Sequence, residues 1–573
     1  MEEDKLDEER RGEDHETLKP LLSVIIYFTL VVSIGGLVFG YYIGFIISRF
    51  AVLNDLDSIL HETIKAGLIG AILGAAAGGW INDCLGRKRS ILIADALIFI
   101  GAASLVLLLF IDDSALFSNY CLETIGNMLI SSGIGIISMT SPLYISEFSP
   151  PKLRDILISI NFIFYGIGKF VFMYRDSSRT TNYAIALAGI PALLQFQEMM
   201  SFPESPMWLL SKKDRENEVV RFLRRIYTCC EVGKELDAFK LSIKKETDNE
   251  DELSYSGSNI FCKIRSAWSS PSIRKQFVVG TALQFVQQLV GLNALIFCIP
   301  NIHRMSGFGP SDPKDDITFI KTSLLANFGL LSMLGGFCCT LCLMARFGKR
   351  KMLYLSICYM LGGVLGLSFI FIVSPNTTEA VSRSQSTIYF NNTCLSYITT
   401  EDADSWDCLT CIRASSGCGF CRGTHYDILG QSSGACLIAG TNGISEACTD
   451  KNRSWITKYC EYNIFGQPVL ISSAIYSLSY SASLEIIPWI MNSQMHPTEV
   501  RGIYGGTAAT ANWISFLIII ILSFFFTKTG GPLFIFLLIS LSLFFVSWWI
   551  KLFVNENIGF SISTRKKELL NDL

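Results

Sequence analysis

Long apolar segments alternate with short polar ones along almost the whole chain. Each apolar segment has about 20 residues or more, the length that a helix needs to cross the roughly 30 Å hydrocarbon core of a bilayer. The pattern therefore predicts twelve membrane-spanning helices. Their expected ranges are 22–49, 61–82, 89–110, 118–146, 156–173, 181–201, 276–300, 318–345, 351–373, 467–492, 503–527 and 531–554.

The composition agrees with a membrane protein and excludes a water-soluble one. The 573 residues are 50% hydrophobic and only 17% charged, and the mean hydropathy is +0.40. A soluble protein carries about 25% charged residues. The net charge of -3 is close to neutral, which argues against a nucleic-acid partner. We expect an all-α protein whose surroundings are a lipid bilayer.

The basic residues of the short loops predict the orientation in the membrane. Lys and Arg gather in the loops after spans 2, 4, 8 and 10 and in the long polar segment after span 6, and all of these lie on one side. Because cytoplasmic loops carry the excess of Lys and Arg, both chain termini are expected in the cytoplasm. The loop residues include Arg87, Lys88, Arg89, Lys152, Arg154, Arg346, Lys349, Arg350, Lys351 and Arg501.

One polar segment, residues 374–466, differs from the rest of the chain because it is rich in cysteine and in N-x-S/T sequons. Clustered cysteines beside glycosylation acceptors predict a disulfide-rich extracellular module. A zinc site is the alternative, since two CxxC pairs follow each other, although the six residues between them are fewer than zinc ribbons use. The cysteines are Cys394, Cys408, Cys411, Cys418, Cys421, Cys436, Cys448 and Cys460, and the sequon residues are Asn376, Asn391 and Asn452.

The chain also contains an internal repeat. Span 2 ends in WINDCLGRKRS and span 8 in LMARFGKRKM, while span 4 ends in SPLYISEFSPPKLRD and span 10 in PWIMNSQMHPTEVRG. Two similar halves are typical of transporters that rock about a central site. We expect an N-terminal tail at 1–21, a first six-helix half at 22–201, a cytoplasmic loop at 202–275, a second half at 276–373 and 467–554, the insert at 374–466 and a C-terminal tail at 555–573.

Seven motifs, each at the expected helix end, make the sequence resemble the inositol transporters of the sugar-porter branch of the major facilitator superfamily. They are GLVFGYYIGFI, GGWINDCLGRKRS, SPLYISEFSP, FPESPMWL, QFVQQLVGLN, PWIMNSQMHP and TANWIS, and the insert with CGFC resembles the plexin-like module of that group. The resemblance implies a major facilitator fold and transport of myo-inositol or a related polyol or sugar with protons. It also implies a monomer in the plasma membrane with no cofactor.

The same motifs suggest where a polyol binds. Amides and indole rings supply hydrogen bonds and apolar faces without charge. By resemblance, Gln287, Gln288 and Asn293 are expected to donate to the polyol, with Trp489 and Trp513 as ring faces. The alternative is that the amides link helices to one another and that the tryptophans are packing residues.

Charged residues at the cytoplasmic helix ends resemble the network that holds the two halves of the family together when the site is open outward. Plain topogenic charge is the alternative interpretation. The residues are Asp83, Arg87, Glu147, Arg154, Glu204, Arg350 and Arg501.

Several positions depart from the family pattern. Tyr42 and Asn127 stand where proton-coupled members have an Asp and an Arg. Glu485 and Lys169 are new charges inside spans, expected to be either a coupling pair or a compensating ion pair. Asp95 lies within the third span, and we expect its side chain to reach the headgroup region.

Two other classes of function were weighed. A receptor or sensor, or a decayed carrier that has kept the fold, is compatible with these departures. An enzyme is not expected, because the chain has five His and shows no nucleophile motif and no cluster of metal ligands in the cytosolic segments.

Overall fold

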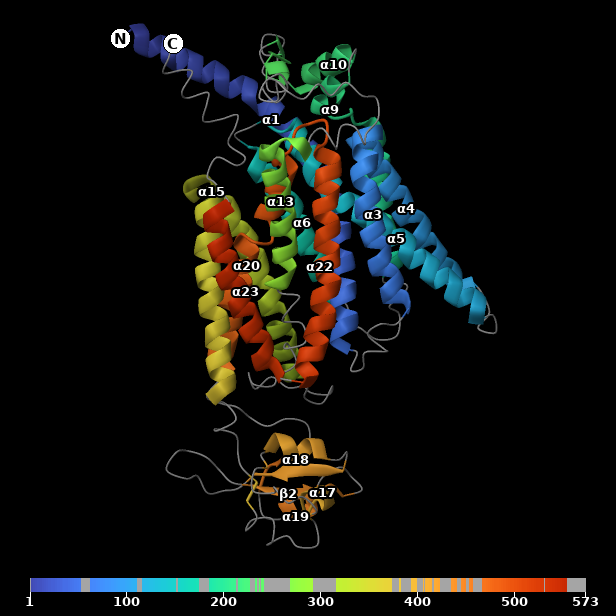
Figure 1. Ribbon diagram of the computed structural model, residues 1–573, viewed down its shortest axis with the longest axis vertical. Coiled ribbons are helices and arrows are strands. Elements are labelled where there is room, and N and C mark those ends of the chain that lie inside the picture. The colour runs from blue at the N-terminus through green and yellow to red at the C-terminus, as the bar shows by residue number, and fades with distance from the viewer. Residues whose placement is uncertain are drawn as a thin grey trace.

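The computed structural model shows a helical bundle with a small separate module beyond one of its ends (Figure 1). Short stretches between 232 and 241 and between 381 and 456 are described, together with ten longer segments. These segments are 2–52, 62–110, 116–150, 153–174, 185–212, 215–226, 268–291, 316–373, 466–529 and 531–553.

The first half of the bundle is built around α5, which packs against α1, α3, α4 and α6. Its helices are α1 (Glu2–Val52), α3 (Glu62–Leu85), α4 (Arg87–Leu107), α5 (Leu116–Phe148), α6 (Arg154–Tyr174) and α8 (Gly189–Ser201), with a 3-10 turn η1 (Leu108–Phe110) after α4. Two short helices, α9 (Pro206–Ser211) and α10 (Glu216–Ile226), follow at the bundle end opposite the module. This half buries a continuous apolar core that includes Val32, Ile91, Ile134 and Leu143.

The second half consists of α13, α15, α20, α21, α22 and α23, and α15 packs closely against α20 and α23. The helix bounds are Pro271–Leu289, Asp316–Val373, Gly466–Ala482, Ile487–Met495, Arg501–Thr529 and Gly531–Phe553, in that order. Helix α15 covers two predicted spans. The chain kinks between them at Gly348, whose φ of 74° is outside the helical range. The two halves meet where α22 lies against α3 and α5, and where α15 and α21 lie against α6.

The tenth predicted span is one apolar run in the sequence but two helices in the structure. The break falls between α20 and α21, where Pro488 has no N–H to donate to a carbonyl one turn earlier. The N–H of Trp489 bonds to Ile486 instead of Glu485. The carbonyl of Glu485 is thereby released from the helix, and Gln287 of α13 donates to it at 2.9 Å. A helix broken inside the membrane needs such a partner for its freed backbone groups.

Within the described residues, nine helical segments are long and apolar enough to cross a membrane, with α20 and α21 counted together as Gln467–Met495. A further apolar segment, Leu334–Met344 of α15, is shorter. The sixth predicted span is observed as the 13-residue helix α8. The seventh is observed as α13, and its expected end at 292–300 lies outside the described residues. The all-α membrane fold expected from the sequence is therefore confirmed, whereas the domain limits stay predictions.

The cysteine-rich module is a small three-stranded antiparallel sheet, in the order β2-β1-β3, with three short helices. Its elements are α17 (Leu395–Ile398), α18 (Cys408–Ala414), β1 (Cys418–Cys421), β2 (Ala435–Ile438), α19 (Glu446–Thr449) and β3 (Trp455–Ile456). Its core combines disulfides with a few apolar side chains such as Phe420 and Tyr397, because so small a unit cannot bury a large apolar interior. The disulfides are Cys394–Cys418, Cys411–Cys436 and Cys421–Cys448, and Cys408 is also disulfide-bonded.

These bonds decide between the two interpretations of the CxxC pairs. Three of the four cysteines bind partners outside the pairs, and the fourth is oxidised as well. Because a zinc ligand must be a thiolate, the zinc interpretation is wrong. Cys460 and the sequon residues Asn376, Asn391 and Asn452 lie outside the described residues.

Mass spectrometry of the unreduced protein should find the three cystine-linked peptide pairs named above. We also expect glycans on Asn376, Asn391 or Asn452, since a sequon beside disulfides on an extracytoplasmic loop is a glycosylation acceptor. Peptides carrying free thiols at all eight positions would contradict the assignment. Cys84 and Cys358, which are exposed and unpaired, provide the internal control for thiol labelling.

Candidate transport site

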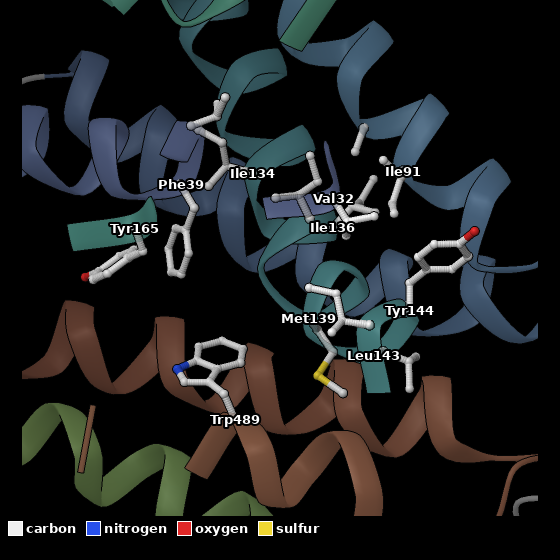
Figure 2. Close-up of a cluster of buried hydrophobic side chains, with 14 of the residues drawn as sticks. Val32, Phe39, Ile91, Ile134, Ile136, Met139, Leu143, Tyr144, Tyr165 and Trp489 are labelled. Atoms are coloured by element: carbon white, nitrogen blue, oxygen red, sulfur yellow. The ribbon is translucent and has the colours of Figure 1, made fainter. Parts of the chain in front are cut away.

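A cavity lies between the two halves, and its empty space is about 470 Å³ including its mouth. Figure 2 shows Trp489 of α21 turned towards Phe39 of α1 and Tyr165 of α6. The ring centroids of Phe39 lie 6.2 Å from Trp489 and 5.7 Å from Trp513. The cavity is lined by Phe39, Ile43, Phe162, Tyr165, Lys169, Gln287, Gln288, Tyr480, Glu485, Trp489, Asn512, Trp513 and Phe516.

An amide cluster forms the polar wall of the cavity, and Asn512 of α22 is at its centre. The amide of Asn512 donates to the side chains of Gln284 at 2.8 Å and Gln287 at 3.1 Å. It accepts from Gln288 at 3.0 Å. The cluster therefore joins α13 to α22, and through the Gln287 bond to Glu485 it joins α13 to the α20–α21 break. The amides link helices and face the cavity at the same time.

Two opposite charges face the cavity from the two halves. Lys169 comes from α6 and Glu485 from the break between α20 and α21, and each is only 4% exposed. No ion pair within 4 Å joins them among the described residues. One carboxylate oxygen of Glu485 is buried without a hydrogen-bond partner in this part of the chain. The Lys169 ammonium lies 6.0 Å from the centre of the Tyr165 ring.

Four of the five residues predicted to bind the substrate line the cavity in the structure. Gln287, Gln288, Trp489 and Trp513 line the cavity together, whereas Asn293 lies outside the described residues. Sequence analysis missed Asn512 and Tyr480. The sequence signal that could have found them is a polar group inside an apolar span, the amide of Asn512 and the hydroxyl of Tyr480. It also missed the aromatic wall from α1 and α6, because apolar residues in a span have no mark that separates cavity from core.

Three other positions singled out by the sequence lie away from the cavity. Tyr42 and Asn127 are buried within the first half, and the Asn127 amide donates to Glu123 of its own helix at 2.9 Å. Asp95 is 0% exposed, and both of its carboxylate oxygens are without a hydrogen-bond partner among the described residues. The expectation that Asp95 reaches the headgroup region is wrong, because its side chain points into the packing of α4 against its neighbours.

At the bundle end near α9, a buried charge cluster joins the halves, which we call the latch (Asp83, Arg87, Glu147 and Arg501). Arg87 binds Glu147 through two hydrogen bonds of 2.9 Å and lies 3.4 Å from Asp83. Arg501 of the second half lies 3.6 Å from Glu147. Asp83 accepts from the backbone N–H of Gly502 and Ile503 at 3.0 and 2.9 Å. A carboxylate at this position stabilises the N-terminus of α22.

A second cluster crosses between the halves beside the latch. Lys349 of α15 lies 3.0 Å from Asp155 of α6, and Gln494 of α21 donates to the same carboxylate at 2.8 Å. Arg350, which was expected in the network, instead donates to the carbonyl of Lys551 within its own half. Arg154 donates to the carbonyl of Ser149 at 3.4 Å.

Two ionisable groups at this end lie outside the membrane-spanning segments. Burial raises the pKa of Glu204, while hydrogen bonds from the backbone N–H groups of Lys88 and Ser205 oppose the increase. Burial, together with nearby Arg501, lowers the pKa of His496 to about 3. The imidazole of His496 is therefore neutral at physiological pH.

A buried cavity between two helical halves that are joined at one end defines a membrane carrier of the alternating-access class. The chain belongs to the sugar transporter family. The family model "Sugar (and other) transporter" matches residues 28–394 and 429–564, and the unmatched stretch lies inside the cysteine-rich module.

Individual relatives and solved structures agree with this assignment. The chain is 32% identical to inositol transporter 4 of Arabidopsis thaliana over 512 residues, covering 86% of this chain and 83% of the relative. It is 27% identical to the human proton myo-inositol cotransporter over 527 residues, covering 88% and 75%. The solved structure of the proton:xylose symporter XylE, a major facilitator superfamily protein, has a TM-score of 0.64 at 20% identity and covers 94% of this chain and 97% of XylE.

Proposed function

We propose that the protein carries myo-inositol or a related neutral polyol across the plasma membrane as a single chain. The observation that carries the proposal is the cavity, which combines indole faces with a bonded amide wall at the interface of the two halves. Each polyol hydroxyl left unpaired in a dry site would cost about 1 to 3 kcal/mol, and the amides, Trp513 and Lys169 offer partners. The names of the relatives support the same substrate class.

We propose that both termini are cytoplasmic and that the module is extracellular. Basic loops, α9 and α10 lie at one end of the bundle, and the disulfide module lies at the other (Figure 1). The cavity offers hydrogen-bonding groups and indole faces, which supports a carrier.

Uptake of labelled myo-inositol into cells that lack their own carrier tests the proposal. We expect saturable uptake that other neutral polyols compete for. The alternative function, a receptor or sensor, predicts binding of the polyol to purified protein with no uptake. Absence of both binding and uptake would contradict the proposal.

Replacing Gln288 by Leu should weaken substrate binding by about 1 to 3 kcal/mol, the value of one unmatched polar group. Thermal stability should fall as well, because the variant loses the hydrogen bond that Gln288 donates to Asn512. Gln195→Leu is the matched control, because Gln195 is a buried amide that bonds to the carbonyl of Val32, away from the cavity. We expect this control to lose stability and keep its apparent affinity. Equal behaviour of the two variants would mean that Gln288 only links helices.

A further inference from the structure

The amide wall of the cavity uses much of its hydrogen-bonding capacity on the protein itself. The amide nitrogen of Asn512 donates to the side-chain oxygens of Gln284 and Gln287, and that of Gln288 donates to the side-chain oxygen of Asn512. The amide nitrogen of Gln287 donates to the released carbonyl of Glu485. The amides therefore position the wall and leave part of substrate recognition to other groups.

Three polar groups that line the cavity can serve a ligand, namely the Lys169 ammonium, the Glu485 carboxylate and the indole N–H of Trp513. Among the described residues, one carboxylate oxygen of Glu485 and the indole N–H of Trp513 are buried without a hydrogen-bond partner. The first and third can only donate, and the second, when ionised, can only accept. A complementary ligand must therefore accept at one side of the cavity and donate at the other.

The charges restrict that ligand further. A single unpaired charge inside a membrane is costly, so Lys169 and Glu485 are tolerated together because their charges cancel within one cavity. An anionic sugar would satisfy Lys169 but meet the Glu485 carboxylate. A cationic sugar would satisfy Glu485 but meet the ammonium. A hydroxyl both donates and accepts, so a neutral polyol satisfies both.

We propose that Lys169 and Glu485 form a charge filter, which admits neutral polyols that bridge the two side chains and rejects charged analogues. This inference rests on the proposed function and adds the reason for its selectivity. Because one charge comes from each half, the bridging substrate also connects the halves across the cavity.

The filter can be tested by unbalancing it. In Glu485→Gln the cavity keeps only the ammonium, and we expect glucuronate to compete with labelled myo-inositol at least about tenfold better than in the wild type. In Lys169→Gln only the carboxylate stays, and protonated glucosamine should gain by a similar factor. Like charges brought together cost several kcal/mol, and about 1.4 kcal/mol corresponds to tenfold. Asp95→Asn, a buried carboxylate outside the cavity, is the control and should leave both preferences unchanged.

A double variant, Lys169→Gln with Glu485→Gln, keeps the test decisive if a single variant folds poorly. The filter predicts that the double variant transports myo-inositol and no longer discriminates against either charged analogue. If Lys169 and Glu485 are only a structural pair, the double variant should recover stability and still reject both charged analogues. That result would overturn the filter. A wild-type protein without binding or uptake of any neutral polyol would overturn the proposed function itself, and that outcome is visible before any variant is measured.

Discussion

Replacing Arg87 by Met should open the latch and destabilise the protein by about 3 to 5 kcal/mol, the usual cost of leaving a buried charge without its partner. Arg87 is completely buried, and its guanidinium holds Glu147 through two hydrogen bonds while lying beside Asp83. Without it, the two carboxylates face each other in a dry site. Thermal unfolding in detergent measures the loss of stability.

Thiol labelling at the latch measures its opening. Ser493 of α21 is buried, and its carbonyl accepts a hydrogen bond from Ser146 of the first half at 3.0 Å. A cysteine introduced at Ser493 should react with a membrane-impermeant reagent at least about tenfold faster in Arg87→Met than in the parent. This factor corresponds to a loss of about 1.4 kcal/mol from the free energy that stabilises the closed latch. Lys349→Met is the control, because its partner Asp155 is 33% exposed and such pairs contribute at most about 1 kcal/mol. Unchanged labelling in Arg87→Met would show that Arg87 does not hold the halves together.

A proton gradient should produce little or no accumulation of inositol. In proteoliposomes with the membrane potential clamped, a symporter moving one proton per substrate would accumulate about a hundredfold across two pH units, since each unit corresponds to a factor of ten. We expect a ratio near one for external pH 5.5 against internal pH 7.5. The physical reason is that Tyr42 and Asn127 stand where proton-coupled members of the family have an Asp and an Arg. An amide does not ionise, and a tyrosine has a reference pKa of about 10.

Glu485 is the acid that could restore proton coupling. The other ionisable side chains that line the cavity are Lys169 and Tyr165 of α6 and Tyr480 of α20. Accumulation that disappears in Glu485→Gln but persists in Asp95→Asn would show that the proton carrier has moved to Glu485. Accumulation that persists in both variants would contradict our interpretation of the coupling. His496 at the latch does not complicate the experiment, because it stays neutral over this pH range.

The membrane fold could be predicted because crossing a bilayer constrains both the length and the polarity of each helix. The break before Pro488 was harder to foresee. A proline inside an apolar run is visible in the sequence, but its effect depends on Gln287, about 200 residues away, whose side-chain amide donates a hydrogen bond to the released carbonyl of Glu485. Such a tertiary hydrogen bond leaves no local signal.

The candidate site was predictable in the same uneven way. Gln287, Gln288 and the two tryptophans were predicted from the family motifs. Asn512 lies in the motif TANWIS beside Trp513, but it was missed because one amide in a span does not indicate by itself whether it faces a ligand or another helix. Asp95 was misplaced for a related reason. Position near a helix end suggested contact with water, but burial is decided by which neighbour packs over the side chain.

The cysteine-rich module lies in the chain between α15, which ends at Val373, and α20, which begins at Gly466. These two helices pack against each other within the second half. Both helices that flank the insertion therefore belong to the second half. A movement of one half past the other carries the module along with the second half and neither stretches nor compresses it. A fluorophore on the outward face of the module would report that movement as a change in distance from a donor on α3, and no residue that lines the cavity would carry a label.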